Sequence, residues 1–260
     1  MRVFDFTHAI VRTPGRSVVH GIRKGPVAPT YEGVLAEHTV YVATLQEAGL
    51  SVDILPPLEA FPDSIFVEDP ALVLPEGAIV LRPGVASRMG EAEEIRAALH
   101  LHFDRVLALE GDEHADGGDV LVTPDEIFIG LSRRTNRKGA EALAAKLAQL
   151  GRRARIAETP ADILHFKTAS SLLDEGTVMA TEAMAASGNF AGFEMVIVRE
   201  GEEGAANFLR VNDVVLVGAH FPRTIAVLRS LGYEVRGMPV EEIAKLDAGL
   251  SCMSLRWRKP

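Results

Sequence analysis

The chain has 260 residues, of which 47% are hydrophobic and 24% are charged, and its formal net charge is −9. This composition is typical of a globular protein with a sizeable core, and it excludes disordered and fibrous classes. The negative charge argues against nucleic acid as a partner and suits a cationic small molecule. No segment reaches the length of a signal-peptide core or a membrane span, so we expect a cytoplasmic protein that contacts no membrane.

The first part of the chain is predicted to form a strand, a loop, a helix and a second strand. A strand-like run covers residues 9–12, and a Pro-Gly turn then opens a loop that reaches Pro29. Apolar residues at helical spacing follow Thr30, a residue type that caps helices, and they end at Gly49. Residues 52–55 alternate in the manner of a short strand.

A hairpin recurs along the rest of the chain at intervals of about forty to fifty residues, with helices and further strands between the copies. The predicted hairpins cover residues 71–81, 120–129, 171–179 and 208–217. The predicted helices cover residues 91–99, 136–150 and 223–231, and strand-like returns lie at residues 106–109, 154–156 and 233–235. Four units are therefore visible, and the first strand together with residues 253–257 would supply a fifth.

This repeat fits two α/β architectures, and periodicity alone favours neither. A closed ring of five units would join the two ends of the chain in one blade and leave a central channel, as in propellers. The alternative is an ordinary mixed sheet with helices on its faces. In either case we expect a single domain over residues 1–260.

Three carboxylates, Asp63, Glu68 and Asp69, lie just before the first of these hairpins. The ordinary interpretation of such a cluster is a solvated loop. However, the stretch between them, which includes Phe66, is too apolar for a free surface loop, so we favour acids held in a partly apolar pocket. Such a pocket would bind a planar cation such as a guanidinium, which donates paired hydrogen bonds.

The corresponding places before the next two hairpins hold Asp116 and Asp119, separated by two glycines, and then His165. The glycines form a turn or allow a close approach of the backbone. A histidine beside apolar residues is more often a buried structural residue than a catalyst. In a closed ring, however, these residues would meet Asp69 and Cys252 at one end of the channel, as nucleophilic catalysis requires.

Cys252 is the only cysteine, so internal disulfides and multi-cysteine zinc sites are excluded. Most unpaired cysteines are small buried apolar residues. The other interpretation is a nucleophile served by a histidine and an acid from elsewhere in the chain, and the flanking Ser251 and Ser254 favour it. A metal site is less favoured because the eight histidines are scattered and no pair is spaced for one face of a helix.

Five motifs taken together resemble the dimethylarginine dimethylaminohydrolase family. They are FPDSIFVED at residues 61–69, DGGDV at 116–120, IGLSRRTN at 129–136, LHFKT at 164–168 and SCMS at 251–254. The resemblance covers nearly the whole chain. It implies the fold of the guanidino-group-modifying superfamily, which is a five-bladed αββαβ propeller, and it implies chemistry without a metal or an organic cofactor.

The same resemblance implies a role for each motif residue. Cys252 would be the nucleophile, His165 the general acid and base, and Asp116 the acid that orients His165 or the guanidinium. Phe166 departs from the leucine that is usual in the family, so it is expected to alter the shape of the pocket. Substrate binding would fall to Asp63, Phe66, Glu68 and Asp69 at the guanidinium, to Arg88 and Arg134 at the α-carboxylate, and to the main-chain carbonyls of Ile22 and Leu246 at the α-amino group.

This chemistry agrees with the residue types. A guanidinium carbon is a poor electrophile, so it needs a thiolate rather than a hydroxyl. We therefore expect hydrolysis of Nω,Nω-dimethyl-L-arginine, and of the monomethyl form, to L-citrulline and an amine through a covalent thiouronium. The alternatives are the same chemistry on arginine or agmatine, a non-catalytic binder of arginine-like cations, and a cysteine peptidase. A homodimer is left open.

Overall fold

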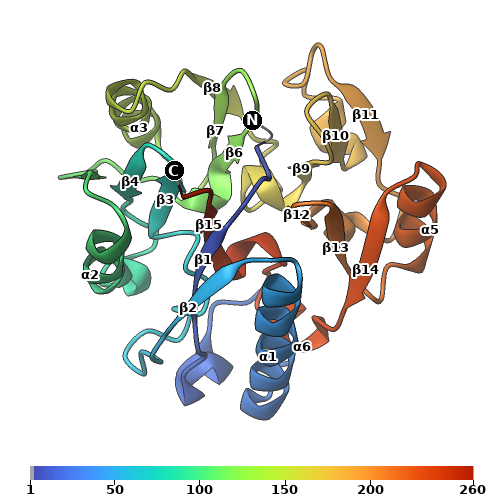
Figure 1. Ribbon diagram of the computed structural model, residues 1–260, viewed down its shortest axis with the longest axis horizontal. Helices are drawn as coiled ribbons and strands as arrows, with labels where there is room; N and C mark the ends of the chain where they lie inside the picture. Colours follow the sequence, from blue (N-terminus) through green and yellow to red (C-terminus); the bar gives the residue numbers. More distant parts are fainter. Residues whose placement is uncertain (1–2, 260) are drawn as a thin grey trace.

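Five separate three-stranded sheets make up the computed structural model, which describes residues 3–259. Each sheet joins an antiparallel pair of strands to a third strand that runs parallel to the middle one. Figure 1 shows the sheets around a common centre, with the longer helices on the outside. The five-bladed αββαβ propeller is therefore confirmed, and the single mixed sheet is excluded.

The chain visits the blades in sequence order. The first blade contains β1 (His8–Arg12), α1 (Tyr31–Glu47), β2 (Ser51–Leu55) and β15 (Ser254–Trp257). The second contains β3 (Ala71–Leu74), β4 (Gly77–Val80), α2 (Glu91–His102) and β5 (Val106–Ala108). The third contains β6 (Val120–Val122), β7 (Ile127–Leu131), α3 (Arg137–Gln149) and β8 (Ala154–Glu158). The fourth contains β9 (Ser170–Leu172), β10 (Thr177–Ala180), α4 (Glu182–Ala185) and β11 (Glu194–Ile197). The fifth contains β12 (Leu209–Val211), β13 (Val214–Gly218), α5 (Pro222–Ser230) and β14 (Glu234–Met238), and α6 (Glu241–Ala244) follows it.

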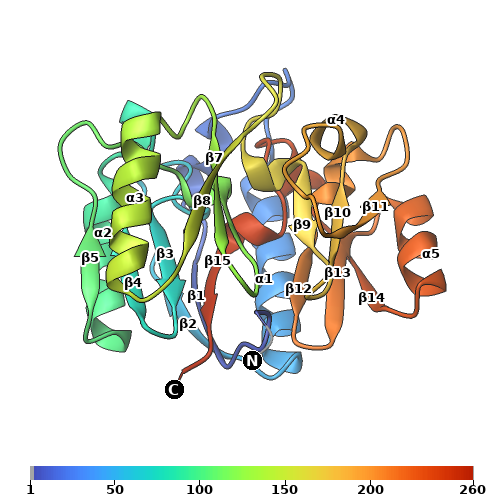
Figure 2. The ribbon, with the colours of Figure 1, turned by 90° about the horizontal axis from the view of Figure 1, so that it is seen from above.

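The ring closes in the first blade, where strands from the two ends of the described chain pair. β1 runs antiparallel to β15, with His8 opposite Trp257, and parallel to β2, with His8 opposite Ser51. Figure 2 shows the two marked chain ends at the same end of the molecule. Because β15 begins two residues after Cys252, this pairing also sets the position of the cysteine.

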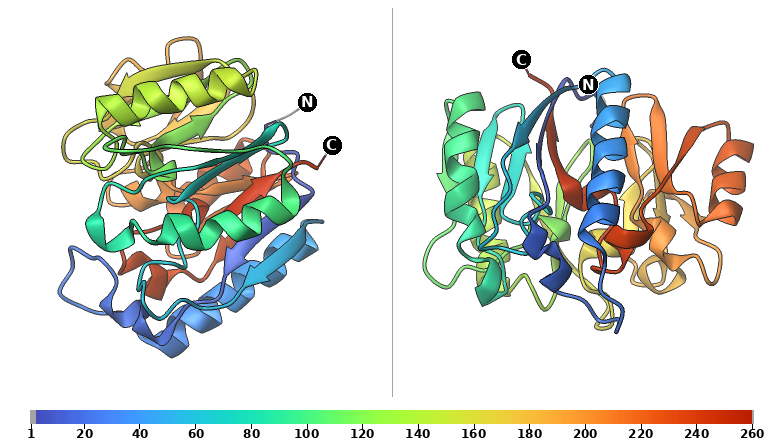
Figure 3. Two further views of the ribbon diagram at one scale, coloured as in Figure 1. Left: turned by 90° about the vertical axis from the view of Figure 1, so that its left-hand side faces the viewer. Right: turned by 90° about the horizontal axis from the view of Figure 1, so that it is seen from below.

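Helix α1 supports the end of β15 that carries Cys252. Thr30 caps the helix as predicted, because its side-chain oxygen accepts a hydrogen bond from Gly33 N. The buried Tyr41 hydroxyl lies 2.5 Å from Ser254 Oγ at the start of β15. Cys252 and Met253 belong to the same hydrophobic cluster as Tyr41. Figure 3 shows α1 beside this last segment.

The main difference from the sequence prediction lies in the fourth blade. Its hairpin was predicted, but α4 and β11 were not. The helix has only four residues, so it carries no helical stripe, and β11 is exposed at both ends and only half-buried between them. The predicted loop before Pro29 also contains a short 3-10 helix over Arg16–His20. Within residues 3–259, no helix has the length and apolar character needed to cross a membrane.

One edge strand of each blade lies nearest the centre, and we call these the inner strands: β3, β6, β9, β12 and β15 (Figure 1). A cavity of about 380 Å³ opens among them and is lined by residues from all five of these strands. It is also lined by Val3 and Arg258, so it opens at the end of the molecule where the chain ends lie. The expected central channel is thus present in this half of the propeller.

Candidate active site

A second cavity, of about 130 Å³, collects most of the predicted site residues. The residues that precede the inner strands contribute to it: Asp69 before β3, His165 before β9 and Cys252 before β15. The predicted residues that line it are Ile22, Asp63, Phe66, Asp69, Arg88, Arg134, His165, Leu246 and Cys252. Asp116 and Glu68 are the two predicted residues that do not line it.

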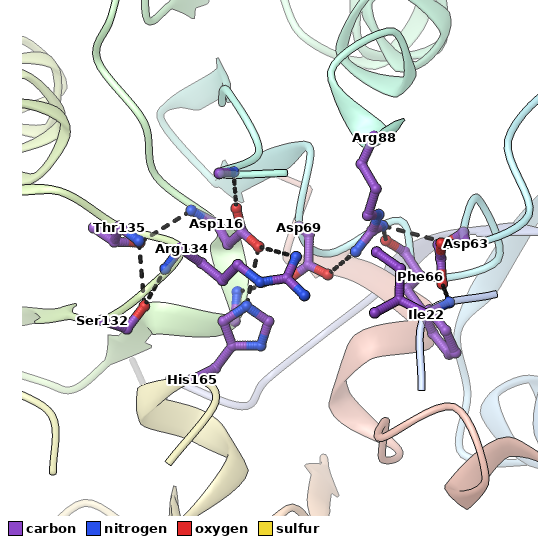
Figure 4. A network of polar contacts seen from close by, with 12 residues as sticks. Ile22, Asp63, Phe66, Asp69, Arg88, Asp116, Ser132, Arg134, Thr135 and His165 are labelled. Atoms are coloured by element: carbon purple, nitrogen blue, oxygen red, sulfur yellow. Dashed lines mark hydrogen bonds and ion pairs between the residues drawn. The ribbon is translucent and has the colours of Figure 1, made fainter. Parts of the chain in front are cut away.

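Asp116 lies behind His165 and holds its imidazole ring. His165 Nε2 is 3.0 Å from Asp116 Oδ2, and Asp116 is fully buried (Figure 4). The other carboxylate oxygen, Oδ1, accepts a hydrogen bond of 2.7 Å from Gly84 N. Both oxygens therefore have partners, and the carboxylate fixes the orientation of the ring, as a base-orienting acid must.

The charge of His165 depends on the carboxylates around it. Burial alone would lower its pKa, but the negative charge of Asp69 and the hydrogen bond to Asp116 together raise the pKa to about 9. At neutral pH the imidazole is therefore protonated on both nitrogens and positively charged. A protonated imidazole that lines the cavity is suited to donate a proton to a leaving amine.

Two glycines allow these groups to come close. Gly118 N donates a hydrogen bond of 3.1 Å to Asp69 Oδ1, and a Cβ at this position would lie 2.7 Å from His165 Nδ1. A Cβ at Gly117 would lie only 2.0 Å from the Glu68 carbonyl oxygen. Neither glycine has a positive φ. Both predicted features are therefore confirmed: the backbone approaches closely at these glycines, and residues 117–119 form a 3-10 turn in which Asp119 N donates to the Asp116 carbonyl oxygen at 3.0 Å.

Arg88 is engaged by the protein itself. Its guanidinium forms a buried ion pair with Asp69 (Figure 4). It also donates to both carboxylate oxygens of Glu91, at 3.0 and 2.7 Å, and to the Phe66 carbonyl oxygen at 3.0 Å. Burial alone would raise the pKa of Asp69, but the charges of Arg88 and His165 lower it. Asp69 is therefore ionised, as a cation-binding group must be.

Arg134 has fewer partners within the described chain. Its guanidinium lies 3.8 Å from Asp116 Oδ2, and its main-chain N donates to Ser132 Oγ at 2.9 Å. Figure 4 shows its side chain alongside His165. The guanidinium therefore retains donors for an anionic group of a bound molecule.

The opposite wall of the cavity is formed by Ile22, Asp63 and Leu246. Asp63 Oδ1 accepts a hydrogen bond of 2.9 Å from Ile22 N, which ties the loop after the first 3-10 helix to the acidic segment. Burial raises the pKa of Asp63. A cationic ligand would oppose that effect and favour the ionised carboxylate.

Cys252 is 8% exposed and lies against the same cavity. Burial, followed by the negative charges of Glu68 and Asp69, raises the pKa of its thiol to about 12. With these two negative charges nearby, the sulfur is a thiol at neutral pH. Of these two carboxylates, Asp69 lines the cavity and would attract a cation, and a bound cation would lower the pKa of the thiol again.

Glu68 faces away from this cavity, although it was predicted to lie at the guanidinium. Its carboxylate pairs with Lys167, lies 3.4 Å from Arg256 Nη2 and accepts a hydrogen bond of 3.1 Å from Ser251 Oγ. It lines the channel cavity instead, together with Lys167 and Arg256. No role was predicted for these two cations. Lys167 belongs to the LHFKT motif, which was the available signal for it.

Phe166 also lies outside the lining of the cavity. Its side chain is fully buried and packs against the rings of Phe128 and Phe190. Its main-chain N donates a hydrogen bond of 2.8 Å to Asp119 Oδ1. The residue therefore helps to hold the backbone beside His165, and its ring does not shape the described cavity as expected.

One group of side chains has the spacing of a metal site. Ligand atoms of Asp69, Asp116 and His165 lie within 4.8 Å of one another. However, the pKa of His165 is raised to about 9, so a metal ion would have to displace its proton. The carboxylates already bind Arg88, Gly84 and Gly118. The donor set therefore fits a histidine held by carboxylates better than a metal centre.

The raised pKa of His165 predicts a pH-dependent contribution to stability. The folded value of about 9 exceeds the unfolded value of 6.5, so the contribution is complete below pH 6.5 and is lost as the pH rises through 9. We expect the free energy of unfolding of the wild type, relative to His165→Gln, to fall by about 3 kcal/mol between pH 6 and pH 9.5. Urea denaturation of both proteins across this range checks it, and a constant difference would contradict it.

The fold and this cavity define a class of αββαβ propeller with a buried Cys-His-Asp site, and comparisons with known proteins place the chain within it. The sequence model of the arginine deiminase family matches residues 55–195. The N(G),N(G)-dimethylarginine dimethylaminohydrolase of Pseudomonas aeruginosa is 36% identical over 97% of this chain and 100% of its own length. The chain belongs to the dimethylarginine dimethylaminohydrolase family.

Solved structures agree with this assignment. A cysteine-to-serine mutant of the P. aeruginosa enzyme in complex with citrulline superposes with a TM-score of 0.94, at 36% identity, over 97% of this chain and 100% of that one. A dimethylarginine dimethylaminohydrolase adduct with S-methyl-L-thiocitrulline superposes with a TM-score of 0.93, at 36% identity, over 96% of this chain and 99% of that one. The family resemblance inferred from the five motifs is thereby confirmed.

Proposed function

We propose that this protein hydrolyses Nω,Nω-dimethyl-L-arginine, and Nω-monomethyl-L-arginine, to L-citrulline and dimethylamine or methylamine. The observation that carries the proposal is one cavity lined by a thiol, a protonated imidazole and two carboxylates, those of Cys252, His165, Asp63 and Asp69. The carboxylates suit a guanidinium, and the thiol and imidazole suit attack on its carbon. The complex of the P. aeruginosa relative with citrulline supports the same product.

The reaction begins when the cationic guanidinium enters beside Asp69. Its positive charge lowers the pKa of Cys252, the thiol gives its proton to water, and the resulting thiolate adds to the guanidinium carbon. His165 then gives its proton to the substituted nitrogen, dimethylamine leaves, and a covalent thiouronium stays on Cys252. The imidazole, now neutral, takes a proton from water. The hydroxide adds to the same carbon, the carbon-sulfur bond breaks, and the hydroxyl proton passes to the sulfur, so citrulline is released with the thiol restored.

Asp116 orients His165 throughout this cycle, and the remaining lining residues bind the amino acid end of the substrate. We assign the α-carboxylate to Arg134 and Arg88, the α-amino group to the main-chain carbonyls of Ile22 and Leu246, and the apolar wall to Phe66. Arg134 has the freer guanidinium of the two arginines. Arg88 would have to exchange part of its bonding to Asp69 and Glu91 for the substrate.

The cycle routes every proton and bond through side chains of this chain and water, so we propose that no metal or cofactor takes part. Glu68 would not contact the guanidinium. Instead it would pair with Lys167 and hold Ser251, the residue before Cys252, through a hydrogen bond from the Ser251 hydroxyl. We further propose that residues 1–260 act as one catalytic domain in the cytoplasm on a small guanidine, and that a homodimer is the assembly to test first.

The direct test is citrulline release from dimethylarginine, monomethylarginine, arginine and agmatine by the purified protein. We expect the methylated arginines to have the highest kcat/KM. Agmatine lacks the α-carboxylate, so it should be poorest by about tenfold or more, the value of a charge-assisted hydrogen bond. Exclusive turnover of an unmethylated guanidine would assign the protein to deiminase-like chemistry. If none of the four substrates is turned over, the protein is better explained as a non-catalytic binder of arginine-like cations.

Arg134→Ala supplies a matched control for this test. It should lower kcat/KM for dimethylarginine by about 10- to 100-fold through the lost bond to the carboxylate, and it should leave agmatine nearly unchanged. An equal loss with both substrates would show that Arg134 acts on the reacting end of the site, through Asp116, and not on the carboxylate.

A further inference from the structure

One inner strand has a preceding residue to which no role has been given. Asp69 and Cys252 each lie two residues before an inner strand, β3 and β15, and His165 and Asp116 lie slightly farther ahead of theirs. Asn207 lies two residues before β12, in the fifth blade. It therefore occupies, in the ring, the place that the other four blades fill with the candidate catalytic groups.

The side chain of Asn207 is 8% exposed and contacts the nucleophile segment directly. Its Nδ2 lies 3.8 Å from Cys252 Sγ, within the range of a hydrogen bond to sulfur. Its Oδ1 accepts a hydrogen bond of 3.3 Å from Ser251 N. Because a main-chain N–H requires an acceptor, the amide oxygen must face Ser251, and the NH₂ group must therefore face the sulfur.

The packing around Asn207 holds this orientation. A Cβ at Gly249 would lie 2.5 Å from Asn207 Cγ, so only a glycine lets the main chain before Cys252 pass so close to the amide. Asn207 also lines a separate cavity of about 810 Å³, which Cys252 does not line. Asn207 therefore borders that cavity and also contacts the sulfur of Cys252.

We propose that Asn207 is a further catalytic residue, whose amide N–H donates to the Cys252 sulfur and stabilises it as the thiolate that attacks the guanidinium. The proposal rests on the proposed function in taking Cys252 as the nucleophile. A hydrogen bond from N–H to an anionic acceptor is stronger than one to the neutral thiol, so the bond gains most of its strength when the thiolate forms.

A neutral donor suits this position better than a charged one. The thiol lies near the carboxylates of Glu68 and Asp69, which oppose the thiolate. A lysine or arginine at position 207 would offset them, but its positive charge would also repel the guanidinium that must bind beside the sulfur. An amide supports the anion without repelling the cation.

Two variants separate this role from a structural one. Asn207→Asp has the same shape, and its carboxylate still accepts the hydrogen bond from Ser251 N, but it places a negative charge against the sulfur in place of the N–H. Asn207→Ala loses both bonds, and water from the neighbouring cavity can replace the donor in part. If Asn207 has a purely structural role, Asn207→Asp should impair the protein less than Asn207→Ala. If its amide stabilises the thiolate, Asn207→Asp should impair the reactivity of Cys252 more than Asn207→Ala.

The measurement is the rate of Cys252 alkylation by iodoacetamide between pH 7 and pH 10, which is proportional to the thiolate fraction. We expect rates about tenfold lower for Asn207→Ala and about 100-fold lower for Asn207→Asp, with kcat/KM for dimethylarginine falling in the same order. Circular dichroism checks that both variants fold. If Asn207→Asp does not fold, the alkylation rate of Asn207→Ala alone tests the proposal.

Rates equal to the wild type in the variants that fold, or a milder effect of Asp than of Ala, would overturn the proposal. The test is independent of the substrate assignment, because alkylation of Cys252 needs no guanidine. If the wild type hydrolyses none of the guanidines, the proposed function fails while the alkylation order still decides the role of Asn207.

Discussion

Cys252→Ala is expected to reduce citrulline formation from dimethylarginine by at least ~10⁴-fold, because no other thiol or hydroxyl side chain is found among the described residues that line the cavity. Cys252→Ser should be almost as severe, since a hydroxyl in this environment has a much higher pKa than a thiol. Citrulline production by purified variants under saturating substrate measures the loss. Mass spectrometry of quenched wild-type reactions should show the thiouronium on Cys252.

Binding separates loss of the nucleophile from loss of the site. Asp69, Arg134 and the loop around Ile22 are untouched in Cys252→Ala, so dimethylarginine should still bind to it in calorimetry. Its Kd should lie within about tenfold of the wild-type KM, since one small side chain is removed from the contact. Residual turnover above about 10⁻⁴ of the wild-type rate would mean that another group attacks the carbon.

His165→Asn is expected to reduce kcat by about 10²- to 10⁴-fold, the usual contribution of a general acid and base. The departing amine would have to leave without the proton that the imidazole supplies, and water would lack its base. KM should change little, because the imidazole bears on the leaving nitrogen rather than on the amino acid end of the substrate. Steady-state kinetics with dimethylarginine near neutral pH measure both constants.

The leaving group allows the two steps of His165 to be separated. The methylthio group leaves as methanethiolate without needing a proton, so S-methyl-L-thiocitrulline should still form the thiouronium on Cys252 of His165→Asn. Hydrolysis of the adduct should then be slow, and methanethiol release should show a burst of about one equivalent. Slow release without a burst would show that His165 is needed before the thiolate adds, for example to set the charge at Cys252.

The propeller was predictable because its hairpins and longer helices carry strong local patterns. The stripe before Gly49 and the cap at Thr30 predicted α1 nearly to the residue. Closure was different, since the pairing of β1 with β15 joins segments at opposite ends of the sequence. No local pattern encodes such a contact, so it rested on the family resemblance. Local patterns also missed α4, because a four-residue helix has no period to detect.

The site was predictable at the level of residue identity and less so at the level of partners. Cys252, His165 and Asp69 meet at one cavity as expected. The direction of the Glu68 carboxylate depends on Lys167, a residue far away in the sequence. In the same way, the direction of the Arg88 guanidinium depends on its ion pair with Asp69, a contact that no local pattern predicts. Asn207 carried no signal of its own because an amide neither titrates nor attacks. Only its place in the ring points to it.

The antiparallel pairing of β1 and β15 also bears on how the protein acquires its activity. The two strands are separated by almost the entire chain, so their contact carries a large loop-closure entropy and is expected to form late in folding. Four blades can assemble with the aspartates and the histidine in place while Cys252 is still unanchored. The reactive sulfur would therefore reach His165 and the aspartates only when β1 and β15 pair. A partly folded chain would be inactive, and activity would appear only when the ring has closed.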